Sequence, residues 1–301
     1  MSQQVFEIVE KFISLEGEAQ YTNHPTVYLR LARCNFTCYG FNNPHKHKDD
    51  RGYAPIYFDP KDYKSLKDIP IIETGCDSQY AVNPKFAHLW EKKTADEVVD
   101  GLINLLPTKT WQHPKTNQNY IFSITGGEPT LHWKKIESIL FHPKMKDCRH
   151  IIFETNASVK ISDEFIVYLY RWLSEDSRRK WTWSNSPKLE CSGEDFSKAI
   201  VPSVVRAQNV LKRRFPNQVD IYFKFVCSGE DADWIEIESV MGEYYLNSDI
   251  NLDTQVWIMP MACIQEQQSA IMKKLAEQCI QRGYLFCYRM QNLIWGNGVG
   301  T

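Results

Sequence analysis

The sequence predicts an α/β fold in which parallel strands and crossover helices alternate around a barrel or partial barrel. The strand-like segments are short, continuous apolar runs, which is the pattern of strands buried on both faces of a sheet. Amphipathic segments of helical period separate them, as in repeated strand–helix–strand units. About six or seven such units fit one large core in 301 residues, and no repeat or flexible linker divides the chain. We therefore expect residues 1–301 to form a single domain.

The individual elements follow from patterns of apolar residues and from one helix cap. Thr94 and Glu97 form a Thr-x-x-Glu capping box ahead of VVDGLINLL, so a helix is expected to begin there. Further helices are expected at about 132–141, 161–175, 230–242 and 263–282. The expected strands are 26–32, 120–124, 150–154, 181–184, 219–226, 254–259 and 284–288.

Residues 39–75 interrupt this alternation. They are rich in Pro, Asp, Lys and Gly and show no sustained apolar period. The segment begins directly after Cys38 and ends directly before Cys76. We interpret it as an inserted loop. Such an insertion is tolerated because lengthening a connection adds little to the entropy cost of closing it.

The composition narrows the class of protein. The formal net charge is −2, so the chain lacks the basic excess that draws a protein to nucleic acid or an anionic membrane. No apolar run approaches about 18 residues, the length of a membrane-spanning helix, and the N-terminus MSQQVFEIVEKF lacks the pattern of a secretory signal. Nine cysteines without such a signal indicate thiols or metal ligands rather than disulfides. We expect a cytoplasmic protein without direct contact to nucleic acid or membrane.

The stretch CNFTCYGF places Cys34 and Cys38 in a C-x3-C pair directly after the strand at 26–32. Phe41 stands where a third cysteine would complete a C-x3-C-x2-C loop. The pair could be two core thiols or belong to a different metal site. If residues 39–75 are an insertion, however, Cys76 follows Cys38 closely and supplies a third thiolate. Three thiolates are the number that leaves one iron of an iron–sulfur cluster open to another ligand.

Polar residues follow three further expected strands. Thr125-Gly126-Gly127-Glu128-Pro129 comes directly after 120–124, where the glycines could expose N–H groups to a carboxylate and Glu128 could hold an ammonium. The plain alternative is a Gly-Pro turn that ends a strand. ETN (154–156) and SNSPK (184–188) follow the next two strands. Because parallel strands end on one face of a barrel, these residues are expected to share a site there.

These motifs form an ordered set along the chain. SLEGE precedes the strand at 26–32 and RLARC ends it, and CDS, TGGEP, ETNAS, SPK, FKFV, IMP and the tail YRMQNLIWGNGVGT follow. A cysteine loop after the first strand and GGEP after the second resemble the radical S-adenosylmethionine superfamily. The complete set resembles the 7-carboxy-7-deazaguanine synthase family from about residue 5 to the C-terminus. The chain departs from that family at Ala19 and Arg33, where Gly is common, and at Ser78, where Thr is usual.

The resemblance implies a partial (β/α) barrel of the radical S-adenosylmethionine type, with an inserted loop region after the second cluster cysteine. It implies a [4Fe–4S] cluster, S-adenosylmethionine and Mg²⁺ as cofactors. The implied reaction is the ring contraction of 6-carboxy-5,6,7,8-tetrahydropterin to 7-carboxy-7-deazaguanine with loss of ammonia, in queuosine-type 7-deazaguanine biosynthesis. Because the cofactor generates the radical, no side chain is assigned a catalytic role.

The resemblance also implies a set of site residues. Cys34, Cys38 and Cys76 would hold the cluster, and Ser78 would bind Mg²⁺ through its hydroxyl oxygen. The residues expected to bind S-adenosylmethionine are Gly126, Gly127, Glu128, Glu154, Asn156, Ser184, Ser186 and Lys188. The residues expected to bind the substrate are Glu16, Gly17, Glu18, Arg30, Thr125 and Thr301.

Three of these assignments have structural alternatives. Arg30 lies late in a strand that should be buried, so its guanidinium needs a carboxylate partner, either from the substrate or from a structural ion pair. Glu18 could bind the N–H donors of the pterin's guanidine-like edge or be a solvated loop carboxylate. Ser78 could be a turn serine.

Two other functions remain open from the sequence. A glycyl-radical-activating enzyme of the same superfamily would act on a glycine of another protein, but the SLEGE segment and the tail favour the pterin enzyme. A regulatory protein on this scaffold would use residues 39–75 to bind a partner. As a radical enzyme the chain needs a reductant such as flavodoxin, and we expect a homodimer.

Overall fold

The core of the protein is a nine-stranded sheet, seen in a computed structural model that describes residues 5–298 and 300. The strands are β1 (Val5–Leu15), β2 (Pro25–Leu31), β3 (Glu91–Thr94), β4 (Ile121–Gly126), β5 (His150–Thr155), β6 (Lys180–Asn185), β7 (Val219–Cys227), β8 (Val256–Pro260) and β9 (Leu285–Phe286). Their order in the sheet is β3-β1-β2-β4-β5-β6-β7-β8-β9. Neighbours from β2 to β9 are parallel, whereas β1 pairs antiparallel with β2 and β3.

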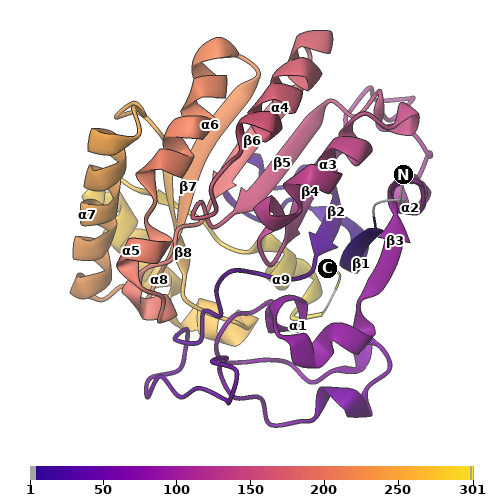
Figure 1. Ribbon diagram of the computed structural model, residues 1–301. Coiled ribbons are helices and arrows are strands. Elements are labelled where there is room, and N and C mark those ends of the chain that lie inside the picture. Colours follow the sequence, from indigo (N-terminus) through magenta and orange to yellow (C-terminus); the bar gives the residue numbers. More distant parts are fainter. Residues whose placement is uncertain (1–4, 299, 301) are drawn as a thin grey trace.

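Helices connect the parallel strands, and α3, α4 and α6 lie side by side along the outer face of the sheet (Figure 1). The α-helices are α1 (Gln79–Val82), α2 (Ala95–Leu105), α3 (Trp133–Leu140), α4 (Asp163–Glu175), α5 (Phe196–Ala199), α6 (Pro202–Arg214), α7 (Asp231–Asn247), α8 (Gln265–Arg282) and α9 (Met290–Trp295). Short 3₁₀ turns are η1 (Ala19–Tyr21), η2 (Pro60–Asp62), η3 (Leu66–Asp68), η4 (Pro84–Leu89), η5 (Pro129–His132), η6 (Pro143–Met145) and η7 (Glu190–Ser192). None of the helices in the described part of the chain has the length and apolar character needed to cross a membrane.

The start of α2 shows how local sequence sets an element. The Thr94 hydroxyl accepts a hydrogen bond from the Glu97 N–H at 3.3 Å, and the Glu97 carboxylate accepts one from the Thr94 N–H at 2.8 Å. Two N–H groups that a helix start leaves without partners are thereby satisfied. The capping box predicted from the sequence is confirmed.

The parallel strands are apolar on both faces, as their sequences predict. Trp181 and Trp183 on β6 are fully buried, and the Trp181 ring stacks on Phe153 of β5 with centroids 5.4 Å apart. The sheet does not close, because β3 and β9 form its two edges. The predicted α/β fold with an open, partial barrel is confirmed.

The antiparallel edge of the sheet and helix α6 were not predicted. In β1, exposed and buried residues mix, and a register shift between Ile8 and Glu10 breaks the alternation. A β-bulge of this kind hides the period of two on which strand prediction depends. Helix α6 fills the crossover between β6 and β7 and begins with Pro202, a residue that favours the first helical turn.

Residues 39–75 contain no strand and no α-helix, only η2 and η3. In Figure 1 this segment lies with α1 beyond one end of the sheet, close to α9. Its two ends meet, since the Gly75 N–H donates a hydrogen bond to the Phe41 carbonyl at 2.7 Å. Because the two ends of the segment meet, Cys76 lies close to the residues that follow Cys38.

Candidate active site

A cavity of about 290 Å³ lies at the carboxyl ends of the parallel strands. Residues from β2 and β4 to β8 form its floor and walls, and the flanks of the 39–75 segment and the C-terminal segment complete it. Ligand sites of parallel α/β folds are expected at this end of the sheet. The predicted site residues that line it are Glu16, Glu18, Arg30, Cys34, Cys38, Cys76, Ser78, Thr125, Gly126, Gly127, Glu154, Asn156, Ser184, Ser186 and Lys188.

Three predicted site residues are not in this lining. Thr301 lies outside the described residues. Gly17 lies beneath the C-terminal segment, where its carbonyl accepts a hydrogen bond from the Met290 N–H at 3.0 Å. A side chain at Gly17 would collide with Gln291, whose Oε1 lies 1.5 Å from the position of an added Cβ. Glycine thus leaves room for the end of the Gln291 side chain, which would have to move if a Cβ were added.

The third of them, Glu128, is fully buried and holds protein groups. Its carboxylate accepts hydrogen bonds from the Thr130 N–H at 3.0 Å, the Thr155 hydroxyl at 2.8 Å and the Asn156 N–H at 2.7 Å. These bonds join the turn after β4 to the end of β5. The observed contacts of Glu128 therefore fix the position of Asn156, which does line the cavity.

The glycine turn after β4 approaches the cysteine loop closely. A Cβ at Gly127 would lie 2.0 Å from the Arg33 carbonyl oxygen, and one at Gly126 would lie 2.1 Å from the Leu31 carbonyl oxygen. The Gly127 and Glu128 N–H groups donate to the Leu31 and Arg33 carbonyls at 3.1 and 2.8 Å. The N–H groups expected to face a ligand carboxylate are thus used to hold the two loops together.

The three thiols of Cys34, Cys38 and Cys76 line the same cavity. Burial raises the pKa of Cys34 and of Cys76 to about 12 and raises that of Cys38 as well, while the nearby Lys188 ammonium lowers the pKa of all three. The thiols are therefore protonated at neutral pH until a cation takes the place of the protons. Among the residues the structure describes, no group of three or more His, Cys, Asp or Glu side chains is arranged to hold a single metal ion.

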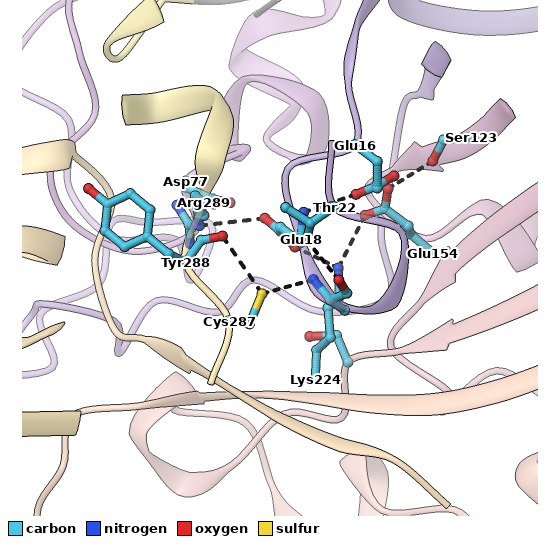
Figure 2. Close-up of polar contacts among 12 residues, drawn as sticks. Glu16, Glu18, Thr22, Asp77, Ser123, Glu154, Lys224, Cys287, Tyr288 and Arg289 are labelled. Carbon is cyan, nitrogen blue, oxygen red and sulfur yellow. Dashed lines mark hydrogen bonds and ion pairs between the residues drawn. The ribbon is translucent and has the colours of Figure 1, made fainter. Parts of the chain in front are cut away.

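A buried ion pair forms the floor of the cavity (Figure 2). The Lys224 ammonium, 4% exposed, lies 2.6 Å from Glu18 Oε2 and 3.7 Å from Glu154 Oε2. Burial opposes ionisation of Glu18, but Lys224 and the nearby guanidinium of Arg289 hold its pKa at about 2. Glu18, whose side chain is 16% exposed, is therefore a partly buried, paired carboxylate and not a solvated loop residue.

Two guanidinium groups line the cavity beside this pair, and Arg289 Nε lies 3.7 Å from Glu18 Oε1. Arg30 Nε donates to Glu10 Oε1 at 2.7 Å, and its Nη1 donates to the Ser78 hydroxyl at 3.0 Å. Glu10 is the structural carboxylate partner that the buried position of Arg30 required. Arg289 Nη1 lies 3.0 Å from Asp77 Oδ2. Both cations remain part of the cavity lining.

Several lining residues were not predicted as site residues, among them Lys224, Arg289, Asp77 and Cys263. A signal for Lys224 exists in the sequence, since a lysine inside the apolar strand VDIYFKFV requires a carboxylate partner. Arg289 and Cys263 have no such signal. They reach the cavity only because β9, α8 and α9 bring the end of the chain back to the cysteine loop.

The comparisons with known proteins agree with this geometry. No protein-family model matches the chain. A 7-carboxy-7-deazaguanine synthase from Rhodopirellula baltica is 23% identical over 299 residues, which are 98% of this chain and 88% of the relative. The crystal structure of QueE from Escherichia coli superposes with a TM-score of 0.51 at 14% identity, over 95% of this chain and 94% of that one.

The relative confirms the resemblance to the 7-carboxy-7-deazaguanine synthase family, and the QueE structure confirms the fold. Two positions where that family commonly has Gly adopt a backbone conformation that favours Gly. Arg33 has φ +76° and Ala19 has φ +55°, a region that costs a residue with a Cβ roughly 1–2 kcal/mol. At Arg33, the side chain makes an ion pair with Glu7 that glycine could not make, whereas the hydrogen bond from its N–H to the Ala81 carbonyl at 2.8 Å is available to either residue.

Proposed function

We propose that this chain is a radical S-adenosylmethionine enzyme of the 7-carboxy-7-deazaguanine synthase type. It converts 6-carboxy-5,6,7,8-tetrahydropterin to 7-carboxy-7-deazaguanine with loss of ammonia, in the biosynthesis of queuosine or a related 7-deazaguanine. The observation that carries the proposal is that one cavity contains the three predicted cluster thiols, the glycine turn after β4 and the Glu18–Lys224 pair. The full-length match to the relative from Rhodopirellula baltica supports it.

The donor set fits a [4Fe–4S] cluster. Cys34, Cys38 and Cys76 supply soft thiol ligands to one cavity, and a set of three would leave one iron open. When bound, the cluster and S-adenosylmethionine supply the radical that starts the reaction. The protein's share is to hold both groups and to keep water from the cavity.

We assign the S-adenosylmethionine site to the wall beside the thiols. Asn156 is fixed there by its backbone bond to Glu128 and by an amide hydrogen bond to Asn35 at 2.8 Å. Lys188, whose ammonium donates to the Ser186 hydroxyl at 3.1 Å, provides a cation for the carboxylate of the amino acid part. The other assigned residues are Gly126, Gly127, Glu154 and Ser184.

The substrate would lie over the floor of the cavity, beside the two guanidinium groups. Its pyrimidine ring has a guanidine-like edge of N–H donors, for which the Glu18 carboxylate is a suitable acceptor. Its carboxylate group is a suitable partner for the guanidinium groups of Arg30 and Arg289, which line the same cavity. This placement would hold the pterin by two of its polar groups.

The binding of Mg²⁺ is a further proposal. The oxygen atoms that would bind the ion already have protein partners. The Ser78 hydroxyl already accepts a hydrogen bond from Arg30, and Asp77 already pairs with Arg289. Two guanidinium groups beside these oxygens disfavour a divalent cation, unless the substrate carboxylate draws them away. No step of the proposed reaction depends on Mg²⁺ here.

Replacement of Ser78 by Ala tests the magnesium assignment. If the hydroxyl binds the ion, Ser78→Ala raises the Mg²⁺ concentration needed for half-maximal turnover by about tenfold, the effect of one lost polar contact of about 1.4 kcal/mol. Turnover is measured over a Mg²⁺ titration, with cluster absorbance as the control for an intact site. An unchanged Mg²⁺ requirement would leave Ser78 as a hydrogen-bond acceptor for Arg30 only.

The remaining assignments complete the proposal. Residues 1–301 would form one domain with an insertion at about 39–75. The enzyme would act in the cytoplasm as a homodimer and receive electrons from a reductant such as flavodoxin.

The decisive experiment is anaerobic reconstitution with iron and sulfide, followed by incubation with S-adenosylmethionine, Mg²⁺, a low-potential reductant and 6-carboxy-5,6,7,8-tetrahydropterin. We expect 7-carboxy-7-deazaguanine and one ammonia per product, both detected by mass spectrometry and an ammonia assay. A reaction without reductant is the control. Cleavage of S-adenosylmethionine with no pterin consumed would contradict the proposed substrate.

A further inference from the structure

Glu16 is a buried carboxyl group at the floor of the cavity. It directly follows β1 and is 4% exposed. Its backbone N–H donates to the His24 carbonyl, and its carbonyl accepts from the Asn23 N–H, both at 2.7 Å. The Tyr28 hydroxyl donates to its Oε2 at 3.1 Å. These bonds hold the carboxyl group in one position. Its charge state then depends on the charged groups around that position.

Three charged groups surround Glu16, and two of them have the same sign. Figure 2 shows Glu18, Glu154 and Lys224 around it. The Lys224 ammonium pairs with Glu18 at 2.6 Å and with Glu154 at 3.7 Å. Among the residues the structure describes, Glu16 has no ion pair of its own. The uncharged titratable groups that face it are Tyr28, Tyr222 and Cys287.

Arg289 is the next cation along the floor, and it does not change the excess of carboxylates over cations. Arg289 lies 3.7 Å from Glu18 and 3.0 Å from Asp77, so one more carboxylate accompanies it. The floor thus contains more carboxylates than cations, and Glu16 itself is only 4% exposed. An unpaired buried carboxylate is costly, and uptake of one proton removes that cost.

The proton belongs on Glu16. Burial, reinforced by the charge of Glu154, raises the pKa of Glu16 to about 8. Lys224 and Arg289 hold the pKa of its neighbour Glu18 at about 2, against the effect of burial. Two carboxyl groups two residues apart therefore differ in charge at neutral pH, since one has a cation partner and the other has none.

We propose that Glu16 binds the substrate as a neutral carboxylic acid whose O–H group donates a hydrogen bond to the carbonyl oxygen of the pterin's pyrimidine ring. Glu18 then accepts from the N–H groups of the same ring, so the floor presents one donor and one acceptor. This role rests on the proposed function and makes Glu16 a determinant of specificity. A ring with an amino group in place of the carbonyl would bring its own N–H donor against the Glu16 O–H donor and bind poorly.

The pH dependence of turnover tests this role in the reconstituted enzyme. The wild-type kcat/KM is expected to fall by about tenfold per pH unit above pH 8, because ionised Glu16 loses its donor. The amide of Glu16→Gln donates but does not ionise, so this variant raises KM by no more than about tenfold at pH 7 and loses the alkaline fall. Glu16→Ala raises KM further at every pH. A fall above pH 8 that persists in Glu16→Gln would overturn the proposal.

Thermal unfolding tests the charge state without any substrate. A carboxyl group whose pKa is raised on folding gives stability that is complete below its unfolded pKa of about 4.5 and is lost as pH rises through 8. The Tm of the wild type should therefore decrease more between pH 6 and pH 9 than that of Glu16→Gln. Glu277→Gln, at an exposed position on α8, is the matched control and should follow the wild type.

The two measurements separate failure of this inference from failure of the proposed function. If the Tm difference is found and no pterin is turned over at any pH, the neutral state of Glu16 stands and the proposed substrate is wrong. If Glu16→Gln and the wild type have the same dependence of Tm on pH, Glu16 is ionised and the inference is wrong, whatever the activity.

Discussion

Cys76→Ala is expected to abolish the iron–sulfur cluster and with it all turnover. Cys76 lies 38 residues after Cys38 in the sequence, yet it lines the same cavity as Cys34 and Cys38. With two thiolates left, the cluster loses its third anchor and an iron is exposed to solvent. Iron and sulfide content after anaerobic reconstitution, together with the brown absorbance, measures the result.

Two other cysteines provide controls for this prediction. Cys263 lines the same cavity, and its thiol lies 3.5 Å from the Gly75 carbonyl oxygen, next to Cys76. Cys148 is buried in the hydrophobic core. Cys263→Ala and Cys148→Ala should both retain the cluster, because neither thiol is an assigned ligand. A full cluster in Cys76→Ala, or its loss in Cys263→Ala, would show that the third ligand has been assigned to the wrong thiol.

Local sequence predicted the parallel half of the sheet because each of its strands is buried on both faces. A continuous apolar run such as HIIFE or WTWS identifies such a strand without knowledge of its neighbours. Strand β1 is different, because its buried residues, such as Phe6 and Ile8, are interrupted by a bulge at the pairing with β2. The short β3, EKKT, has no apolar residue and exists only through its pairing with β1. Such elements depend on tertiary contacts that a local pattern does not contain.

The same distinction applies to the site. Residues that follow a strand, such as Asn156, could be placed because the end of a parallel strand fixes where they lie. The hydrogen bonds of Glu128 could not be foreseen, since a carboxylate beside two glycines is equally suited to a ligand ammonium and to backbone N–H groups. The junction of the 39–75 segment was predictable from the spacing of cysteines, whereas the positions of Arg289 and Cys263 depend on how the last helices pack.

Lys224→Met is expected to be the most destabilising substitution in the floor of the cavity. The side chain of Lys224 is 4% exposed and that of Glu18 is 16% exposed, and removal of the ammonium leaves a buried carboxylate without its partner. Loss of one member of a buried ion pair lowers the free energy of unfolding by about 3–5 kcal/mol. The kcat/KM should fall by roughly a hundredfold as well, because Glu18 no longer binds the pterin as a positioned carboxylate.

Lys85→Met is the matched control for Lys224→Met. Lys85 lies 2.7 Å from Asp49, close to the length of the Lys224–Glu18 pair, but its side chain is 31% exposed. A pair in contact with solvent contributes about 0–1 kcal/mol, so this variant should unfold almost as the wild type does. Urea-induced unfolding of the three proteins at pH 7 measures the difference.

The dependence of this effect on pH distinguishes a lost ion pair from lost packing. Lys224 and Arg289 hold the pKa of folded Glu18 near 2, below its unfolded value of about 4.5. The stability that this shift supplies is complete above pH 4.5 and is lost as pH falls toward 2. The deficit of Lys224→Met relative to the wild type should therefore be smaller at pH 4 than at pH 7. An equal deficit at both pH values would mean that the aliphatic part of Lys224, and not its charge, stabilises the floor.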